Sequence, residues 1–348
     1  MVTPVITQQA YIDFSLKPSL MKVGYIILVL ILSIFAMGFA QEESEGAVNR
    51  GLFTDHSLSQ NAMLWGITTD ESDTSWFTDG QNGAIGRVWP ATGSISLYEI
   101  PGGGYPVDLQ NDTTGRIWFT DAGQTGVGKL GRFDPSGETF KTHDIPGENT
   151  RPQRLAIDAD GTLWFTAYGS GQIGKLVPIT GAFTMIDLPS ASAGPMGIDI
   201  DGGGFIWFTE YENNRIGRIN PNKLDLAPEE FELPTANSGP WDIVVASDGR
   251  IWVTEHRAGK LAVFDPADET FEEFALPSLG KPFGLQINSQ GKIWIADFAN
   301  SSVLKFIPIE SKFVEHTREG SSPIDVAVDD DDDVWVADMG KSRILRLT

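Results

Sequence analysis

Residues 194–220 read GPMGIDIDGGGFIWFTEYENNRIGRIN, and this stretch decides the predicted fold. Alternation of apolar and polar residues in IDI and IGRI favours β-strands, while DGGG and YENN favour tight turns. A further run ending in FELP (231–234) completes the unit. The unit is therefore predicted to hold four antiparallel strands, the first lining a central channel and the last facing outward.

The same unit recurs along the chain, each time with a tryptophan that opens a β-type triplet. The spacings between these tryptophans are 42, 46, 43, 45, 42 and 41 residues. A period of this length with several short strands is typical of propeller blades. We therefore predict an all-β, seven-bladed β-propeller over residues 51–348, in which the tryptophans pack between blades. They are Trp76, Trp118, Trp164, Trp207, Trp252, Trp294 and Trp335.

The two ends of the repeat region predict how the ring closes. The final unit ends with RILRLT (343–348), which corresponds to its third strand, whereas LFTDHSL (52–58) resembles outer strands such as FKTHDIP (140–146). Residues 51–58 should therefore pair with residues 342–348 and cover an otherwise open sheet edge. His56, His143 and His316 fall in predicted outer strands, where we expect them to be exposed.

Composition excludes several classes of function. The chain has 25 Lys and Arg against 47 Asp and Glu, a net charge of −22, which disfavours nucleic acid and anionic membrane surfaces as partners. It has no cysteine, which excludes disulfides and thiolate metal sites. The remaining partners are a small molecule, a peptide or a partner protein, and the protein is expected to be a monomer.

The amino-terminal part has the pattern of an export signal. Residues 23–40 carry no charge, and they are preceded by basic and followed by acidic residues. We predict that residues 1–40 form a signal peptide or an N-terminal membrane anchor and that residues 41–50 form an acidic linker. Translation from Met21 would favour the signal peptide and translation from Met1 the anchor. Either way the body is predicted to lie outside the cytoplasm, secreted or tethered.

The repeats resemble those of the virginiamycin B (streptogramin B) lyase family. The resemblance rests on GPMGIDI (194–200), IWFTEYENNRIGRI (206–219) and GRIWFTD (115–121), and it covers all of the chain except the leader. It implies a seven-bladed propeller. For activity it implies a magnesium-dependent lyase that opens the ester of a cyclic depsipeptide by elimination.

The chemistry of that family does not carry over residue by residue. Its catalytic blades carry histidine directly after the proline that begins a blade, with glutamates before one such proline and after the last tryptophan strand. In the last blade those glutamate positions hold Ser322 and Met339. Elimination needs groups that accept and donate protons, which apolar side chains cannot do. The positions after the prolines hold Val107, Gln153, Met196, Trp241, Phe283 and Ile324.

The second position after each proline is polar in several blades, and it faces the predicted channel mouth. Asp108, Asp242 and Asp325 would meet Arg154 there. Aromatic rings would flank them, so this set is a candidate ligand pocket with stacking walls. The alternative is a water-filled mouth in which the charges satisfy one another. The aromatic candidates are Trp241, Phe283 and Tyr168.

Acidic residues end the tryptophan strands of six blades. One interpretation is a carboxylate ring that binds Mg²⁺ or Ca²⁺, with Asp242, Glu255 and Asp297 as candidate ligands. The other is that these acids accept hydrogen bonds from loop N–H groups in each blade. No organic cofactor is expected. The six acids are Asp79, Asp121, Glu210, Glu255, Asp297 and Asp338.

His256 is the one histidine of four that the repeat pattern places at this rim. With Asp242 and Glu255 nearby it is a candidate catalytic base or metal ligand, and the simpler interpretation is an exposed loop histidine. Three functions therefore remain open. They are a non-catalytic binding or scaffold propeller, a carbon–oxygen lyase of the virginiamycin B lyase type acting on another ester or glycosidic substrate, and a lactonase-type hydrolase.

Overall fold

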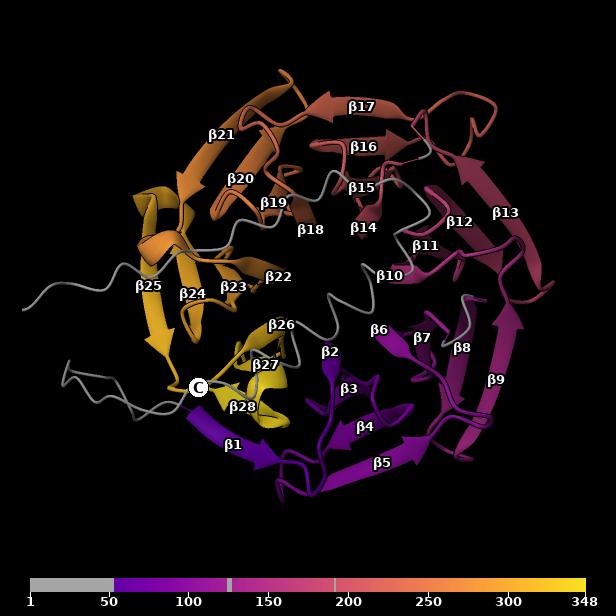
Figure 1. The fold of residues 1–348 in the computed structure, drawn as a ribbon, viewed down its shortest axis with the longest axis vertical. Helices are drawn as coiled ribbons and strands as arrows, with labels where there is room; N and C mark the ends of the chain where they lie inside the picture. The colour runs from indigo at the N-terminus through magenta and orange to yellow at the C-terminus, as the bar shows by residue number, and fades with distance from the viewer. Residues whose placement is uncertain (1–52, 124–126, 191) are drawn as a thin grey trace, which may run out of the picture. The chain divides into compact units, whose positions relative to one another are not determined.

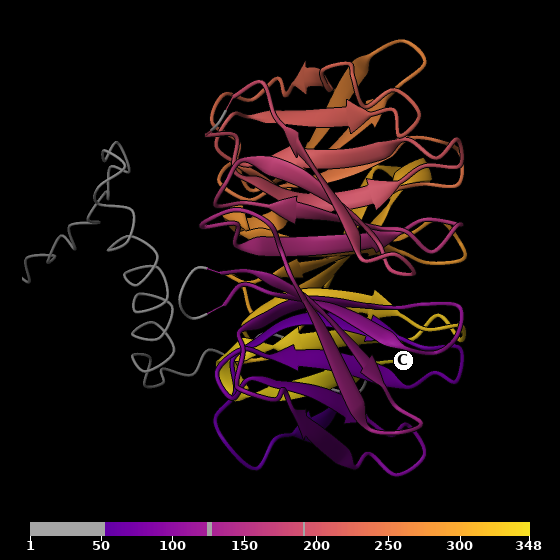
Figure 2. The same ribbon diagram turned by 90° about the vertical axis from the view of Figure 1, so that its right-hand side faces the viewer.

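The structure is a computed structural model that describes residues 53–123, 127–190 and 192–348. Within these residues the chain forms seven four-stranded antiparallel sheets arranged around a central axis (Figure 1). The predicted fold class is therefore confirmed. Figure 2 shows the blades from the side, with their connecting loops gathered at the two ends of the ring. The predicted leader and linker lie outside the described residues, and no helix of the described part is long and apolar enough to cross a membrane.

Each of the first six blades is built from four consecutive strands. Blade 1 is β2 (Leu64–Thr69), β3 (Ser75–Asp79), β4 (Ala84–Val88) and β5 (Ile95–Glu99). Blade 2 is β6 (Pro106–Asn111), β7 (Ile117–Asp121), β8 (Lys129–Asp134) and β9 (Thr139–Asp144). Blade 3 is β10 (Pro152–Ile157), β11 (Leu163–Ala167), β12 (Gln172–Val177) and β13 (Ala182–Asp187). Blade 4 is β14 (Pro195–Ile200), β15 (Ile206–Glu210), β16 (Arg215–Ile219) and β17 (Glu229–Glu232).

The remaining blades follow the same order. Blade 5 is β18 (Pro240–Val245), β19 (Ile251–Glu255), β20 (Lys260–Asp265) and β21 (Thr270–Ala275). Blade 6 is β22 (Pro282–Ile287), β23 (Ile293–Asp297), β24 (Ser302–Ile307) and β25 (Lys312–Thr317). Blade 7 takes β26 (Pro323–Val328), β27 (Val334–Asp338) and β28 (Arg343–Leu347), with three-residue 3₁₀ turns at Pro277–Leu279, Pro308–Glu310 and Met339–Lys341 lying in loops.

The fourth strand of blade 7 comes from the other end of the described chain. β1 (Phe53–Ser57) pairs with β28 in antiparallel register, from Phe53 opposite Leu347 to Ser57 opposite Arg343. Figure 1 shows β1 beside β28 at the junction between blades 7 and 1. The predicted closure is confirmed. It covers the backbone edge of β28.

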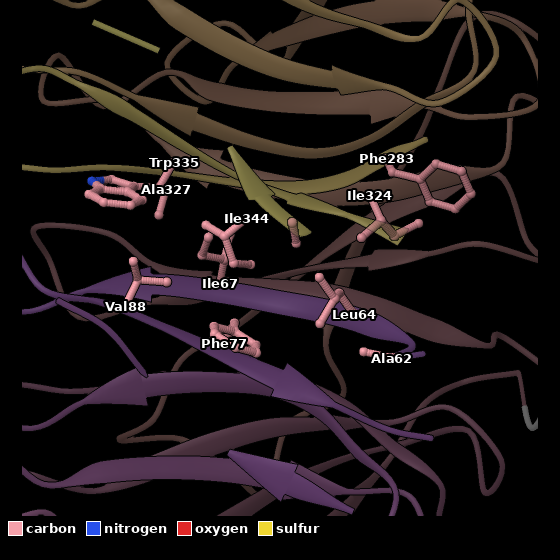
Figure 3. Packing of buried hydrophobic residues seen from close by; sticks show 11 residues of the cluster. Ala62, Leu64, Ile67, Phe77, Val88, Phe283, Ile324, Ala327, Trp335 and Ile344 are labelled. Atoms are coloured by element: carbon pink, nitrogen blue, oxygen red, sulfur yellow. The ribbon is translucent and has the colours of Figure 1, made fainter. Parts of the chain in front are cut away.

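The tryptophans of the second strands pack between blades, as predicted. Figure 3 shows the contact that joins the ends of the ring, where Trp335 of blade 7 lies in one core with Phe77 and Val88 of blade 1. The six other blade pairs have equivalent cores. In five blades the indole N–H also donates to an aspartate in the preceding turn, at 2.8–3.1 Å. The donors are Trp76, Trp118, Trp164, Trp207 and Trp335.

Residue size is matched between the second and third strands of each blade. Phe165 of β11 lies opposite Gly174 of β12, where an added Cβ would lie 2.0 Å from the ring. Where the second strand has a smaller residue, the third strand has a larger one. Val253 faces Ala262, and Ile295 faces Leu304. This exchange keeps the packed volume nearly constant, as close-packed interiors require.

Three histidines are in the outer strands, as predicted, but none of them is exposed, since two are buried and His143 is half-buried. His56 and His316 are each 9% exposed. Their rings lie over Trp335 and Trp294, with centroids 5.6 and 5.4 Å apart, and His143 lies over Trp118 in the same way. The outer strand has an inward face that covers the inter-blade tryptophan, which corrects the expectation of exposure.

A ring of threonines joins neighbouring blades near the channel. Thr254 of β19 accepts the backbone N–H of Asp242 in its own blade at 3.0 Å and donates to the carbonyl of Phe283 in the next at 2.7 Å. Thr78, Thr120, Thr166 and Thr209 make the equivalent pair of bonds. Blades 6 and 7 have Ala296 and Ala337 at this position.

Candidate functional site at the channel mouth

An irregularity at the start of every innermost strand sets the geometry of the site. In blade 3, for example, the pairing of β10 with β11 shifts register between Pro152 and Leu155. A β-bulge of this kind re-aims the side chains inside it. The two positions after the blade's first residue fall within this shift. The same shift occurs in five other blades, and in blade 7 a shorter one lies between Pro323 and Asp325.

Arg154 sits at the centre of the ring and contacts carboxylates from three other blades. Its Nη1 lies 3.0 Å from Asp108 Oδ1 and 2.7 Å from Asp325 Oδ2. Its Nη2 lies 2.9 Å from Asp325 Oδ1 and 3.3 Å from Asp242 Oδ2. The structure therefore brings together all four charged residues predicted for the pocket. They satisfy one another across the channel, which is the second of the two sequence interpretations.

Each of these carboxylates also ties its blade to the next one. Asp108 accepts the backbone N–H of Leu155 at 2.9 Å, and Asp242 accepts that of Leu285 at 3.2 Å. Asp325 accepts the N–H of Ile67 at 3.2 Å. Glycines at the same position in the intervening blades make room, since a Cβ on Gly66, Gly197 or Gly284 would lie within 3 Å of the neighbouring aspartate.

Three carboxylates are buried around one guanidinium, and burial disfavours the ionised forms of two of them, Asp108 and Asp242. The side chains of Asp108, Asp242 and Asp325 are only 6%, 10% and 3% exposed. Burial raises the pKa of Asp108 to about 6 even though Arg154 acts in the opposite direction. Burial also raises the pKa of Asp242. The four side chains therefore form a closed structural network, and they do not leave an open set of charges for a ligand.

Most of the acids at the ends of the tryptophan strands accept loop hydrogen bonds. Asp121 accepts the N–H groups of Tyr105 at 2.8 Å and Gly123 at 2.9 Å. Asp79, Asp297 and Asp338 likewise accept the N–H of the residue just before the first strand of their own blade. For these four the hydrogen-bond interpretation from the sequence describes the geometry.

Glu210 and Glu255 depart from this pattern. The longer side chains lie in blades whose first strand is preceded by a glycine with positive φ, Gly194 or Gly239. Glu255 is fully buried, and neither carboxylate oxygen has a hydrogen-bond partner among the residues that the structure describes. Burial, reinforced by the nearby charge of Glu273, raises the pKa of Glu255 to about 8. The protonated, neutral form of Glu255 is therefore the major one at pH 7.

The acids do not fit a divalent cation. Asp242 is engaged with Arg154, Glu255 is buried in a different environment, and Asp297 accepts the N–H of Lys281 and a side-chain N–H of Asn300. Hard cations need several oxygen ligands that converge on one point. Across residues 53–123, 127–190 and 192–348, no group of three or more histidines or acids is placed to hold a metal. No step of a mechanism is therefore assigned to Mg²⁺ or Ca²⁺.

Two of the three aromatic candidates, Trp241 and Phe283, lie in a contiguous aromatic cluster on blades 4 to 6. The rings of Trp241 and Phe283 have centroids 4.7 Å apart, and those of His256 and Phe283 lie 4.3 Å apart. Tyr211 contacts Trp241 at 5.4 Å, and Phe298 contacts Phe283 at 5.5 Å. All except Phe283 are partly exposed. We define these five residues as the aromatic cluster.

His256 lies within this cluster and is neutral. Its Nδ1 donates to the carbonyl oxygen of Pro282 at 3.1 Å, because that oxygen can only accept. Burial lowers the pKa of His256 to about 4. The imidazole is therefore a weak base. Glu255 and Asp242 are not among its hydrogen-bond partners in the described chain, so the three candidate catalytic residues do not form a linked set.

Charged groups border the aromatic cluster. Arg257 lies over the ring of Tyr211 at 4.1 Å and pairs with Glu212 at 2.8 Å. Glu212 also accepts the hydroxyl of Tyr168 at 3.1 Å, so Tyr168 belongs to this polar border rather than to the aromatic cluster. Lys281, which the sequence reasoning missed, donates from Nζ to the carbonyl of Arg257 at 3.1 Å. Its position just before a blade-starting proline was the available signal.

The architecture defines a closed seven-bladed propeller with a charge-filled channel and an aromatic cluster at one end. Propellers of this class differ in function mainly through the residues at such ends. The chain belongs to the virginiamycin B lyase family, whose sequence profile matches residues 40–305. An NHL repeat profile matches residues 321–347.

Similar proteins agree with this assignment. A virginiamycin B lyase from Nocardia farcinica (strain IFM 10152) is 32% identical over 103 residues, which make up 29% of this chain and 33% of that protein. The match thus spans about a third of the relative's length. A streptogramin B lyase structure has a TM-score of 0.78 with 26% identity and covers 85% of this chain and 97% of that one.

A second solved structure is similar in fold. It is a catalytically inactive histidine-to-alanine variant of virginiamycin B lyase from Staphylococcus aureus with quinupristin. Its TM-score is 0.77 with 23% identity, over 85% of this chain and 98% of that one. At this identity the likeness establishes the shared fold.

Proposed function

We propose that this protein is a non-catalytic binding propeller that holds a small molecule or peptide against the aromatic cluster. The observation that carries the proposal is the contact of Trp241 and Phe283 at the positions where the family's catalytic blades have histidine. Aromatic rings bury large areas and stack on ligands, but they cannot accept or donate the protons of an elimination. The bound ligand would therefore be released without chemical change.

The charge network below the aromatic cluster supports this proposal. Arg154 is fully engaged by Asp108, Asp242 and Asp325, so these four charged groups hold one another in place and give the cluster a rigid base. A site held by locked side chains is pre-organised, which lowers the entropic cost of binding.

The alternative is a carbon–oxygen lyase in which His256 takes the proton. The observation that favours it is the bond from Nδ1 to Pro282, which leaves the Nε2 lone pair to act as a base. Against it, a pKa of about 4 makes that lone pair a poor proton acceptor, and in the described chain no acid is joined to it to serve the leaving oxygen. A lactonase would need a cation site, which the described acids do not provide.

We further propose that the protein acts outside the cytoplasm. The proposal rests on the uncharged stretch at residues 23–40 and the acidic residues after it. A cell fractionation with a carboxyl-terminal tag would test it, and recovery in the cytosol would contradict it.

The test of function compares turnover with binding. Quinupristin is incubated with the protein and Mg²⁺, and ring opening is followed by mass spectrometry alongside His256→Ala. We expect no opening above the uncatalysed rate in either sample. Opening that is lost in His256→Ala would overturn the proposal in favour of the lyase. In parallel, a thermal-shift screen of aromatic small molecules and short peptides should yield ligands whose effect disappears in Trp241→Ala.

A further inference from the structure

Lys281 lies beside the aromatic cluster. Among the described residues its ammonium has no carboxylate partner. Lys281 immediately precedes Pro282, whose carbonyl binds His256, and its own carbonyl accepts the N–H of Phe298 at 3.2 Å. It is partly buried, and in the described chain no acidic side chain lies within ion-pair distance of its ammonium. Its Nζ donates one hydrogen bond, to Arg257.

This arrangement differs from that of the other charges at the mouth. Arg257 is neutralised by Glu212, and Arg154 is surrounded by three aspartates. Asp297, at the end of β23, bonds to the backbone N–H of Lys281 at 2.7 Å rather than to its ammonium. An ammonium has three donors, so the Lys281 side chain retains capacity for an incoming acceptor.

We propose that the ligand of the aromatic cluster is an aromatic anion whose charged group binds Lys281 Nζ while its ring stacks on Trp241. This inference rests on the proposed binding function and adds the chemical class of the ligand. The argument is one of charge complementarity. A protein with a net charge of −22 repels anions at long range, so an anionic ligand needs a local cation. A partly desolvated ammonium beside apolar rings supplies a strong hydrogen bond to such a group.

Two fluorescent probes with the same aromatic body test this inference. 8-Anilinonaphthalene-1-sulfonate carries a sulfonate, and N-phenyl-1-naphthylamine does not. Both are titrated against the full chain at fixed pH 7.5 and fixed salt. The variants are Lys281→Gln, Lys281→Arg and Trp241→Ala, with Lys223→Gln as control because Lys223 is an exposed lysine in the loop between β16 and β17.

We expect Lys281→Gln to weaken sulfonate binding about 5- to 10-fold and to leave binding of the neutral probe unchanged. Lys281→Arg should retain most of the sulfonate affinity. Trp241→Ala should weaken both probes, and Lys223→Gln neither. Since the bond to Asp297 uses backbone N–H, Lys281→Gln should fold normally, and an unchanged thermal melt checks this.

The outcomes separate this inference from the proposed function. If Trp241→Ala weakens both probes but Lys281→Gln changes neither, the aromatic-anion inference is overturned and the binding function stands. The inference is also overturned if the neutral probe binds as tightly as the sulfonate. If Trp241→Ala changes neither probe, the aromatic cluster is not a binding site, and both proposals fail.

Discussion

Arg154 and Asp325 are joined by two hydrogen bonds, of 2.7 and 2.9 Å, although they are 171 residues apart in the chain. The pair links β10 of blade 3 to β26 of blade 7 through the centre of the ring. Asp108 and Asp242 complete the contacts of the same guanidinium. Four of the seven blades thus meet at one side chain.

Replacing Arg154 with methionine should destabilise the protein strongly. The three buried carboxylates would lose their common partner, and breaking a buried ion pair costs about 3–5 kcal/mol in the free energy of unfolding. Urea unfolding at pH 8 measures this. Arg250→Met is the control, because Arg250 and its partner Asp248 are 40% and 51% exposed. Equal effects from the two substitutions would contradict the role of Arg154.

The stability of the protein should fall as the pH rises from 6.5 to 8. The pKa of Glu255 is raised from 4.5 to about 8, so in this range the folded state holds a proton that the unfolded state has lost, and each rise in pH favours unfolding. Below pH 6.5 the raised pKa values of Glu255, Asp108 and Asp242 all act in the same direction, and the lowered pKa of His256 offsets them only in part. Urea midpoints should decline to about pH 8 and then level off. A midpoint that climbs steadily to pH 9 would refute this.

Glu255→Gln should stabilise the protein at pH 8.5 and flatten that decline. A neutral amide removes the buried charge that ionisation would create, and we expect a gain of roughly 1–3 kcal/mol in the free energy of unfolding. The matched variant is Asp121→Asn at the equivalent position of blade 2. That carboxylate accepts two loop N–H groups, so its loss should destabilise the protein. A gain from both substitutions would mean that the two acids are equivalent after all.

Removing β1 should lower the melting temperature sharply. A chain that begins at residue 59 loses the pairing with β28 and exposes an edge, and it also loses the ring of His56 over Trp335. A chain that begins at residue 51 keeps both and serves as the control. Differential scanning calorimetry compares the two, and coincident melts would show that the closure adds nothing.

Thr254→Val should weaken the contact between blades 5 and 6. The substitution keeps the shape of the side chain but removes the hydroxyl that joins Asp242 N–H to the Phe283 carbonyl. Leaving these buried groups unpaired costs about 1–3 kcal/mol in the free energy of unfolding. Chemical denaturation measures this cost. A neutral result would assign the blade contact to the tryptophans alone.

The sequence predicts the fold well because the same pattern of strands and turns recurs in seven repeats. Spaced tryptophans, alternating strands and the unmatched ends determine blade number, strand order and closure. It also predicts that Asp108, Arg154, Asp242 and Asp325 meet, because they share one position in the repeats of blades 2, 3, 5 and 7.

The remaining features depend on side-chain reach and on loop conformation, which repeat positions do not encode. Glu255 occupies the same slot as Asp297, yet one added methylene and a positive φ at Gly239 leave it without the loop hydrogen bonds. Lys281 lies outside the repeat's polar positions, so periodicity does not single it out. The burial of His56 follows from the packing of the outer strand against Trp335.

The pairing of β1 with β28 has a consequence for synthesis. Asp55 of β1 and Arg343 of β28 are bonded at 2.8 Å, yet they are 288 residues apart. A ribosome makes β1 before any blade and β28 after all the other strands of the ring. For most of translation, β1 has no partner and the growing arc has open edges. The pairing that closes the ring therefore forms last, and until then it competes with aggregation of the nascent chain.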